Sequence, residues 1–405
     1  MSPTQPRPRL VYVTTHGASA LGLMRGQLSL MRDRGFEVIV IASPSPELDA
    51  AAEREGVHSI GLEMAREMSP VADIRSLWNL IRVLRELRPD IVNAGTPKAG
   101  VLGMLAGWIA RVPSRIYTLR GLRLETTRGL KRLILANAER LAAACAQRVI
   151  CVSASLREVY LSLRLARAVK CIVLGSGSSN GINVRRFQLS EAQHAEAATL
   201  REKFGIPVDA PAIGFVGRLV RDKGIVELFD SFRQLQPRIP GLRLVLVGDF
   251  EAGDPVPTDV VQQLRSDPAV TITGFVRNAE LYYDLFDVLA FPSYREGFPN
   301  VPLEAAAAGL PVVGFAATGT LDAVVEGVTG SLVAVGDTSA LTTALHRYLT
   351  DDLLRFRHGD AGRQRVASEF RNETIWNALF ELYVSQLPEA KRPVMAAATD
   401  AARAA

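Results

Sequence analysis

Short apolar runs alternate with amphipathic stretches from one end of the chain to the other. A continuous apolar run is typical of a strand buried on both faces of a parallel sheet, and apolar residues repeated every three or four positions are typical of a surface helix. The runs predict strands at Leu10–Thr14, Glu37–Ala42, Ile91–Ala94, Ser114–Thr118, Val149–Val152, Cys171–Leu174, Ala212–Val216, Leu242–Val247, Val270–Thr273, Val288–Phe291 and Pro311–Phe315. The stretches between them predict helices at Leu23–Arg34, Asp73–Leu87, Gly100–Ala110, Leu130–Ala146, Ser155–Leu163, Ile225–Leu235, Thr258–Arg265, Glu280–Leu285, Leu303–Ala308, Ser339–Thr350, Leu353–Glu369 and Glu373–Gln386.

This order of elements predicts an α/β fold, with two doubly wound, Rossmann-like domains facing across a cleft. The segment Gly175–Phe187 is rich in Gly, Ser and Asn, so it is the predicted interdomain linker. The predicted domains span residues 1–187 and 188–372. Residues 389–405 are rich in Ala and are expected to form a disordered tail.

The composition is that of a globular protein without a membrane span. The chain has 405 residues, of which 48% are hydrophobic and 22% charged, which fits two packed domains. Its longest apolar runs are broken well short of the roughly 20 residues that a transmembrane helix needs. The first residues lead into a strand without a secretory apolar segment, the three cysteines form no paired motif, and the five histidines have no metal-ligand spacing. These features predict a cytoplasmic protein without disulfides or bound metal.

The charge is distributed unevenly. Residues 1–187 carry 27 Lys and Arg against 14 Asp and Glu, a balance of +13, and the remaining residues have a balance of −8. Solvated surface charge explains this about as well as a basic domain that faces an anionic membrane or a diphosphate. Nucleic acid is not an expected partner, because no aromatic and basic residues are interleaved as in known binding modules.

The stretch Ser293–Gly309 reads S-Y-R-E-G-F-P-N-V-P-L-E-A-A-A-A-G and has glutamates at 296 and 304. Its two prolines exclude one continuous helix across the pair. A helix that begins at Pro302 and is capped by Gly309 puts Glu304 in the first turn, beside unpaired N–H groups and the positive end of the dipole. Loops at the carboxyl ends of parallel strands bind ligands, and one carboxylate can accept hydrogen bonds from both ribose hydroxyls. The stretch therefore predicts a nucleotide-sugar pocket.

A second loop, Gly214–Gly224, has the sequence G-F-V-G-R-L-V-R-D-K-G between a predicted strand and a predicted helix. Its glycines allow the backbone to approach a ligand closely. Arg218 and Lys223 offer a guanidinium fork and a point charge, which suit a diphosphate. An ordinary solvent-facing loop is the alternative when this motif is taken alone.

Polar residues also follow three predicted strands of the first half. Small residues around Gly17 suit an anion at the start of the next helix, and His16 is either a substrate contact or a polar residue at a helix entry. Lys98 lies in N-A-G-T-P-K-A-G, and Arg120 and Arg123 lie in R-G-L-R-L-E. The following helix has an apolar side that either faces the core or, with the nearby basic residues, contacts lipid phosphate.

Over residues 8–388 the chain resembles the retaining family-4 glycosyltransferases, which have a GT-B fold. The resemblance is carried by E-G-F-P-N-V-P-L-E at 296–304, G-R-L-V-R-D-K-G at 217–224, L-V-G-D-F-E near Gly248, T-G-F-V at 273–276 and G-V-T-G at 327–330. M-S-P-V-A-D-I-R-S-L at 68–77, T-P-K-A-G and S-S-N-G-I-N resemble a bacterial branch that assembles surface polysaccharide and lipopolysaccharide. The resemblance implies that a last helix, 373–388, returns to complete the first domain.

The resemblance also implies roles for individual residues. Arg218 and Lys223 would hold the donor diphosphate, Glu304 the ribose and Glu296 the donor sugar. Further donor contacts would come from the backbone near the base, from the loop after Glu296 and from the other domain, at Val276, Gly297, Phe298, Pro299, Asn300 and Gly17. The expected acceptor-binding residues are His16, Lys98, Arg120 and Arg123.

The chain departs from its relatives at two places where they often have histidine, which here hold Gly95 and Arg120. Retaining transfer of this kind is expected to need no strong base, because the leaving phosphate can accept the acceptor's proton. No metal cofactor is expected, because the cations of Arg218 and Lys223 take its place. Arg120 would then help to bind an anionic acceptor.

The predicted function is transfer of a hexose or N-acetylhexosamine from a nucleotide-diphosphate sugar to a lipid-linked saccharide. The expected base is uracil, with guanine as the alternative, and the acceptor carrier is undecaprenyl diphosphate or lipid A-core. The enzyme is expected at the anionic inner face of the cytoplasmic membrane. A nucleotide-sugar epimerase and a silent nucleotide-sugar-binding scaffold on the same fold are the alternatives.

Overall fold

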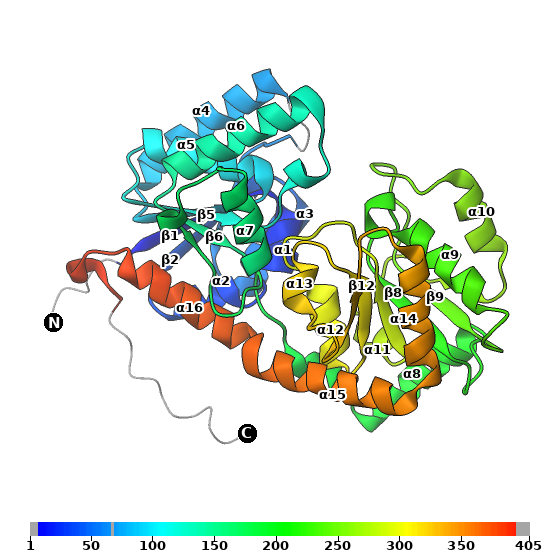
Figure 1. Cartoon of the computed structure of the whole chain (residues 1–405). Helices are drawn as coiled ribbons and strands as arrows, with labels where there is room; N and C mark the ends of the chain where they lie inside the picture. The colour runs from blue at the N-terminus through cyan, green and yellow to red at the C-terminus, as the bar shows by residue number, and fades with distance from the viewer. Residues whose placement is uncertain (1–6, 66–68, 394–405) are drawn as a thin grey trace. The chain divides into compact units, whose positions relative to one another are not determined.

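Two parallel sheets organise the chain, which is described here from a computed structural model covering residues 7–65 and 69–393 (Figure 1). The chain divides into two compact units. Unit 1 comprises Met1–Asn180 and Asn372–Ala405, and unit 2 comprises Gly181–Arg371. Met68, the first residue of one motif used above, lies outside the described residues.

Unit 1 has a seven-stranded sheet in the order β3-β2-β1-β4-β5-β6-β7, in which every pair is parallel. Its elements are β1 Arg9–His16, α1 Gly17–Leu23, α2 Gln27–Asp33, β2 Glu37–Ser43, α3 Pro46–Glu55, β3 His58–Gly61, α4 Pro70–Leu87, β4 Ile91–Gly95, α5 Pro97–Ile109, β5 Ser114–Leu119, η1 Arg123–Glu125, α6 Gly129–Cys145, β6 Arg148–Cys151, α7 Ala154–Ser162, η2 Ala168–Lys170, β7 Cys171–Ile172, α16 Asn372–Ser385 and η5 Glu389–Lys391. Helices α4, α5 and α6 lie side by side on one face of this sheet (Figure 1). The other face is covered by α1, α2, α3 and α16.

Unit 2 has a six-stranded parallel sheet in the order β10-β9-β8-β11-β12-β13. Its elements are η3 Val184–Phe187, α8 Glu191–Lys203, β8 Ala212–Val216, η4 Arg221–Lys223, α9 Ile225–Leu235, β9 Arg243–Val247, α10 Thr258–Ser266, β10 Val270–Ile272, α11 Glu280–Tyr283, β11 Val288–Phe291, α12 Asn300–Ala307, β12 Val312–Phe315, α13 Thr320–Ala323, β13 Gly330–Val333, α14 Thr338–Thr350 and α15 Asp352–Glu369. The main core of this unit packs α9, α10 and α14 on one face of the sheet.

Each sheet has one place where the strand order changes direction. In unit 1 this switch point lies between β1 and β4, and in unit 2 it lies between β8 and β11. Open parallel sheets bind their ligands beyond the carboxyl ends of the strands at such a point. The fold thus indicates where each unit can hold a ligand.

Helix α16 is part of unit 1, although unit 2 precedes it in the chain. Its Tyr383 accepts a hydrogen bond from Asn93 of β4 at 2.6 Å and donates one to Tyr12 of β1 at 3.1 Å. Trp376 Nε1 donates to Asn180 Oδ1, and Asn372 Nδ2 donates to the Asn180 carbonyl, both at 2.7 Å. Asn180 and Asn372, which flank unit 2 in the chain, are therefore hydrogen-bonded to each other.

Several sequence predictions differ from the structure. The helix predicted at Leu23–Arg34 corresponds to α2, which begins only at Gln27, because Gly26 before it has a φ of +76° and its Cα faces the Trp376 ring. Helices α1, α3, α8 and α13 and strands β3 and β13 were not predicted. The linker expected to end at Phe187 leaves unit 1 at Asn180, and η3 packs on α11 and α12 in unit 2.

The first part of the expected disordered tail, residues 389–393, lies within the described part of the chain. Residues 389–391 form η5, and Lys391 Nζ lies 2.6 Å from Asp90 Oδ1. Residues 394–405 lie outside the described part of the chain.

A buried carboxyl group makes the stability of unit 1 depend on pH. Glu139 of α6 is 7% exposed and accepts hydrogen bonds from the hydroxyls of Tyr117, at 3.0 Å, and Tyr160, at 3.2 Å. Burial raises its pKa from 4.5 to about 7, although both hydrogen bonds oppose the shift. Between these two pH values the folded protein holds a proton that the unfolded chain releases, so stability falls as the pH rises through this window.

We expect Glu139→Gln to remove this dependence, since the amide keeps the shape and carries no charge. From pH 5 to pH 8 the variant's free energy of unfolding should rise relative to the parent by up to about 3 kcal/mol. Urea denaturation at pH 5, 6, 7 and 8 measures the difference. Glu158→Gln, at an exposed position of α7, is the control; equal pH profiles for the parent and Glu139→Gln would contradict the assignment.

Candidate functional site

Two loops meet at the switch point of unit 2. Strands β8 and β11 are hydrogen-bonded neighbours, with Ile213 in register with Val288. The loop after β8 covers residues 217–224, and the loop after β11 covers residues 292–299. These are the two loops that carry the predicted donor-binding motifs.

The loops touch at positions where only glycine fits. Gly224 has a φ of +70°, and a Cβ there would overlap the carbonyl oxygen of Pro292. Gly248, after β9, has a φ of +149°, and a Cβ there would overlap the carbonyl of Gly217. The three loops are thus packed backbone against backbone, which places their side chains at one end of the sheet.

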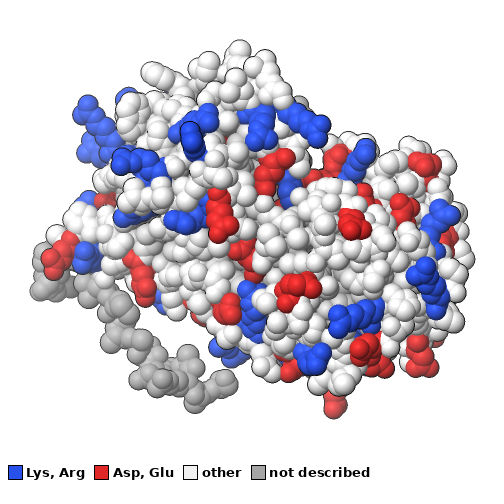
Figure 2. All heavy atoms as spheres, viewed as in Figure 1, with Lys and Arg blue, Asp and Glu red and all other residues white. Residues whose placement is uncertain are grey.

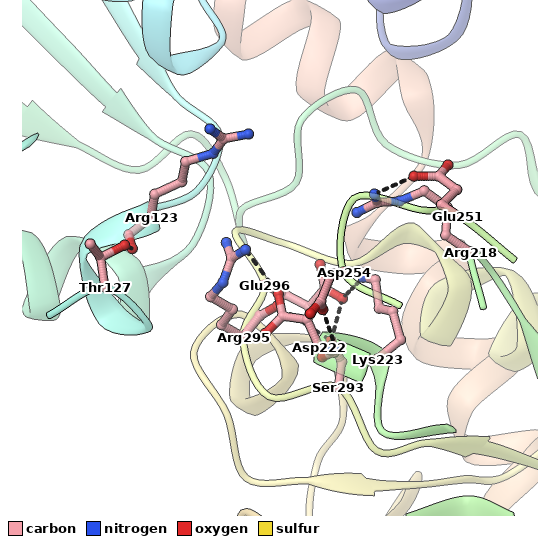
Figure 3. Close-up of polar contacts among 10 residues, drawn as sticks. All are labelled: Arg123, Thr127, Arg218, Asp222, Lys223, Glu251, Asp254, Ser293, Arg295 and Glu296. Atoms are coloured by element: carbon pink, nitrogen blue, oxygen red, sulfur yellow. Dashed lines mark hydrogen bonds and ion pairs between the residues drawn. The ribbon is translucent and has the colours of Figure 1, made fainter. Parts of the chain in front are cut away.

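An ion pair joins the two predicted motifs. Lys223 Nζ contacts Glu296 Oε1, and Ser293 Oγ donates a hydrogen bond to the same oxygen at 2.8 Å (Figure 3). The two charged side chains are only 18% and 16% exposed, so their attraction is weakly screened by water. The loop after β8 and the loop after β11 therefore form one polar cluster.

Residues that were not predicted hold this cluster in place. Arg295 Nη2 lies 2.8 Å from Asp222 Oδ2, and the amide of Asp222 donates to Asp254 Oδ2 at 2.7 Å (Figure 3). The amide of Tyr294 donates to the carbonyl of Asp222 at 3.0 Å. Asp222, Ser293 and Arg295 lie inside the predicted motifs, but nothing in the sequence shows that they would pair across the two loops.

Arg218 and Lys223 contact different carboxylates. Arg218 is 54% exposed, and its Nη1 lies 3.0 Å from Glu251 Oε2 (Figure 3). Lys223 is directed to Glu296. Each cation thus has an acidic partner of its own, with which a bound diphosphate would compete.

Glu304 lies deeper in its helix than predicted. Helix α12 begins at Asn300, with Pro299 as its N-cap, so Pro302 is the third helical residue and Glu304 the fifth. Glu304 therefore lies outside the first turn. Pro299 and Pro302 have no N–H groups, which leaves the amides of Asn300 and Val301 as the unpaired donors of this end. Gly309 has a φ of +85° after the last helical turn, as its predicted capping role requires.

The carboxylate of Glu304 has a defined partner. Its Oε2 accepts a hydrogen bond from the hydroxyl of Tyr283 at 2.7 Å. Burial raises the pKa of Glu304, and both this hydrogen bond and the charge of Arg186 oppose the shift. Tyr283 was not predicted as a site residue.

The remaining donor-binding candidates of unit 2 are buried or partly buried. The ring of Phe298 is buried and packs against Phe370, with ring centroids 5.4 Å apart. The carbonyl oxygen of Gly297 lies close to Gly319, since a Cβ added at Gly319 would be 2.6 Å from this oxygen. Asn300 Oδ1 is buried without a hydrogen-bond partner, and Val276 lies partly exposed on the loop after β10.

The candidates of unit 1 lie at the carboxyl edge of its sheet. His16 ends β1, and its Nε2 atom is buried without a hydrogen-bond partner. Gly17 packs against the start of α3, where a Cβ would overlap the amide of Leu48, so this glycine has a packing role of its own. Lys98 Nζ lies 2.7 Å from Asp73 Oδ1 of α4.

Arg123 and Arg120 differ in their surroundings. Arg123 is exposed in η1, and its carbonyl accepts a hydrogen bond from Thr127 Oγ1 at 2.7 Å (Figure 3). Arg120 follows β5 and lies against Gly95 of β4.

Helices α4 and α6 present apolar residues to solvent. Trp78 of α4 is 70% exposed and Leu130 of α6 is 73% exposed. Other exposed apolar side chains on α4, α5 and α6 are Val71, Ile74, Trp108, Leu133, Ile134 and Leu141. The alternative that the apolar side of α6 faces the core is therefore wrong; its buried residues are Glu139, Ala142, Ala143 and Cys145.

Basic residues accompany this apolar surface. Figure 2 shows Lys and Arg side chains over the part of unit 1 that holds α4, α5 and α6, whereas both signs are mixed over unit 2. Within residues 7–65 and 69–393, no helix is long and apolar enough to cross a membrane. The same residues contain no group of three or more His, Cys, Asp or Glu that could hold a metal ion.

Two family models match the chain, one in each unit. The model described as Glycosyl transferase 4-like domain matches residues 17–177, and the model described as Glycosyl transferases group 1 matches residues 210–351. The chain is 36% identical over 375 residues to the capsular polysaccharide biosynthesis glycosyltransferase CapM of Staphylococcus aureus, an alignment that covers 92% of this chain and 96% of the relative.

A second relative and a solved structure extend the comparison. The chain is 25% identical over 328 residues to UDP-Gal:α-D-GlcNAc-diphosphoundecaprenol α-1,3-galactosyltransferase of Escherichia coli, covering 80% of this chain and 82% of the relative. The crystal structure of HepE from Anabaena in complex with UDP-glucose superposes with a TM-score of 0.77 at 22% identity, covering 93% and 99% of the two chains. The structural likeness shows the fold alone and confirms the predicted class of two Rossmann-like α/β domains.

The contact between the loops at Gly224 can be tested against a glycine of similar conformation. We expect Gly224→Ala to destabilise unit 2 by roughly 2 kcal/mol or more, because the new methyl group is forced into Pro292. Gly241→Ala is the matched control, since its φ of +76° resembles that of Gly224 and a Cβ there meets nothing within 4 Å. Its expected cost is only the roughly 1 kcal/mol of left-handed backbone strain. Urea denaturation that gives equal costs for the two variants would exclude the close contact.

Proposed function

The chain belongs to the family of group 1 and 4-like glycosyltransferases, which have the GT-B fold, and on this premise we propose that it transfers a sugar with retention from a nucleotide-diphosphate sugar to a lipid-linked saccharide. The observation that carries the proposal is the Lys223–Glu296 cluster at the switch point of unit 2. The sugar is a hexose or an N-acetylhexosamine, and the pathway is bacterial polysaccharide or lipopolysaccharide assembly.

Uracil is the proposed base, and the support for it comes from related proteins. The name of the Escherichia coli relative gives UDP-Gal as its donor and a diphosphoundecaprenol-linked sugar as its acceptor. HepE was crystallised with UDP-glucose. For this chain, Val276 and the loop after β10 are the proposed neighbours of the base.

The proposed chemistry depends on stabilising the leaving group. The bond between the anomeric carbon and the β-phosphate oxygen breaks, and the acceptor oxygen bonds to the same face of the sugar. The leaving phosphate accepts the acceptor's proton. Negative charge that develops on the diphosphate is stabilised by Lys223 and Arg218, and the amides of Asn300 and Val301 add preorganised donors.

The two glutamates have separate proposed roles. Glu304 accepts hydrogen bonds from the ribose hydroxyls, since its carboxylate keeps acceptor capacity beyond the bond from Tyr283. Glu296, fixed by Lys223 and Ser293, accepts from the donor sugar's hydroxyls and offsets the positive charge that develops at the anomeric carbon.

Unit 1 is the proposed acceptor domain, with His16, Lys98, Arg120 and Arg123 at or near the carboxyl edge of its sheet. The exposed apolar residues of α4 and α6 are the proposed contact with the membrane that holds the acceptor lipid. The basic residues among them would attract anionic headgroups at about 1 kcal/mol each.

The donor site is tested by substitution at Lys223 and Glu304. We expect Lys223→Ala to lower kcat/KM roughly 100-fold or more, because the leaving diphosphate loses a nearly buried cation. Glu304→Gln should weaken binding of the nucleoside diphosphate, because the ribose loses a charged acceptor. Lys203→Ala, at an exposed position of α8, is the control.

The assay uses a panel of nucleotide sugars with undecaprenyl-diphosphate-linked and lipid A-core saccharides as acceptors, and titration calorimetry for UDP and GDP. An α-linked product from an α-linked donor supports retention. Full activity of Lys223→Ala would overturn the site. Conversion of the nucleotide sugar without any acceptor identifies an epimerase, and binding without turnover identifies a scaffold.

The membrane contact is tested on vesicles. We expect Trp78→Ala to lower the partition coefficient onto phosphatidylglycerol vesicles by about tenfold, because a large aromatic side chain no longer enters the interface. Phe356→Ala is the matched control, since Phe356 is 74% exposed on α15 of unit 2. Equal loss in the two variants, or no binding by the parent, would contradict the proposed surface.

A further inference from the structure

Gly95 and Arg120 are adjacent in space at the end of two paired strands. Gly95 is the last residue of β4 and is in register with Thr118 of β5, two residues before Arg120. A Cβ at Gly95 would lie 3.0 Å from Arg120 Nε and 3.5 Å from Thr118 Cβ. The missing side chain of Gly95 is thus what gives the guanidinium group its place.

Arg120 has no acidic partner within the described ranges, and its Nη1 atom is buried without a hydrogen bond. Its titratable neighbours are the phenol groups of Tyr383 and Tyr12, and burial raises the pKa of both, which keeps them neutral. Burial lowers the pKa of Arg120 to about 10, and the two tyrosines only partly oppose this. A buried cation with an unpaired donor is costly unless something with negative charge binds to it.

Arg115 of β5 shows how this protein provides hydrogen-bond acceptors for an arginine with a structural role. Arg115, near the start of β5, donates from Nε to the carbonyl of Cys145 at 2.7 Å and from Nη1 to the carbonyl of Val112 at 2.6 Å. Its guanidinium group is thus bonded to backbone acceptors. Among the described residues, no backbone carbonyl accepts a hydrogen bond from Arg120, which follows the opposite end of β5. This separates Arg120 from the arginines that serve the fold.

Arg120 lies beyond the carboxyl end of a strand, which is where open parallel sheets bind ligands. It follows β5, next to β4 and close to the switch point between β1 and β4. At the same edge, His16 at the end of β1 also has a buried ring nitrogen without a partner. Two unsatisfied polar atoms at one edge point to a ligand rather than to the core.

We propose that Arg120, in the space left by Gly95, binds an oxyanion of the acceptor, either a carboxylate or a phosphate. The planar fork of a guanidinium group matches both, because each presents two oxygens for parallel hydrogen bonds. This inference rests on the proposed function, since it assigns a chemical group to the acceptor of that same transfer. A carboxylate would belong to an acidic sugar, and a phosphate to the lipid carrier.

Titration calorimetry with sodium glucuronate and with inorganic phosphate tests the site directly. The full chain is used in an Arg218→Ala, Lys223→Ala background, because both of these cations of unit 2 would bind phosphate themselves. We expect Arg120→Gln to weaken binding of at least one anion about tenfold or more, since a charged hydrogen-bond donor is lost. Arg167→Gln, at an exposed arginine of unit 1, should bind as the parent does.

Gly95→Ala tests the site while keeping the charge. The new methyl group would lie 3.0 Å from Arg120 Nε, so the guanidinium group has to shift by a few tenths of an ångström. We expect several-fold weaker anion binding and a fold that is retained. Gly22→Ala is the matched control, because a Cβ there meets nothing within 4 Å. Arg120→Lys should restore only part of the affinity, since a point charge replaces the fork.

The outcomes separate the two anions and the two proposals. Binding of glucuronate alone assigns an acidic sugar, and binding of phosphate alone assigns the lipid diphosphate. If neither anion binds, or if Arg120→Gln binds both as tightly as the parent, the site is wrong. A failure of the proposed function would instead appear as absent UDP binding by the wild-type chain and would leave these anion titrations unaffected.

Discussion

The parallel pairing of β8 with β11 is the constraint on which the rest of unit 2 depends. Because these strands are neighbours at the switch point, two loops 73 residues apart at Lys223 and Glu296 leave the sheet side by side. Glycine at 224 then lets the backbones touch, and the ion pair forms inside that contact. The chemistry of the cluster follows from topology, since its two ion pairs, Lys223–Glu296 and Arg295–Asp222, each join one loop to the other.

The sequence was sufficient for the elements with strong patterns. The strands at both switch points were predicted from their apolar runs, and both predicted donor-binding motifs lie in the loops that follow such strands. Helix α8 was missed because it has only one buried residue, Ala197, and so no apolar stripe. Its capping box, Ser190 with Gln193, and the Ser45–Pro46 start of α3 were the available signals. The edge strands β3 and β13 are four residues long and too weakly patterned to stand out.

The site was predictable by position and much less by contact. Pro299 is the N-cap of α12, so the helix begins at Asn300 rather than at Pro302, and Glu304 lies beyond the first turn. The pairing of Arg218 with Glu251, and of Glu304 with Tyr283, joins residues far apart in the chain that no local spacing connects. On α6 the apolar residues predicted a helix correctly, but whether their side faced the core or solvent depended on what packs against it.

Both units combine paired and unpaired polar groups at their sheet edges. In unit 2 the ion pairs of the cluster join its two loops, which keeps the loops in a fixed arrangement. Among the described residues, Arg120 Nη1 and His16 Nε2 in unit 1 are buried without hydrogen-bond partners, and so are Arg295 Nε and Asn300 Oδ1 in unit 2. Such atoms cost stability unless a ligand, an ion or water completes the set.

The position of Asn180 has a consequence for the order in which the protein is made. Unit 2 is continuous from Gly181 to Arg371, whereas unit 1 lacks α16 until the residues after Asn372 are added. During synthesis unit 2 therefore has its full set of strands and helices while the first unit still exposes the surface that Tyr383 and Phe380 cover. The hydrogen bonds of Trp376 and Asn372 to Asn180 can form only after α16 has been made. The sheet of unit 1 is therefore translated first, but the helix that completes its core is added last.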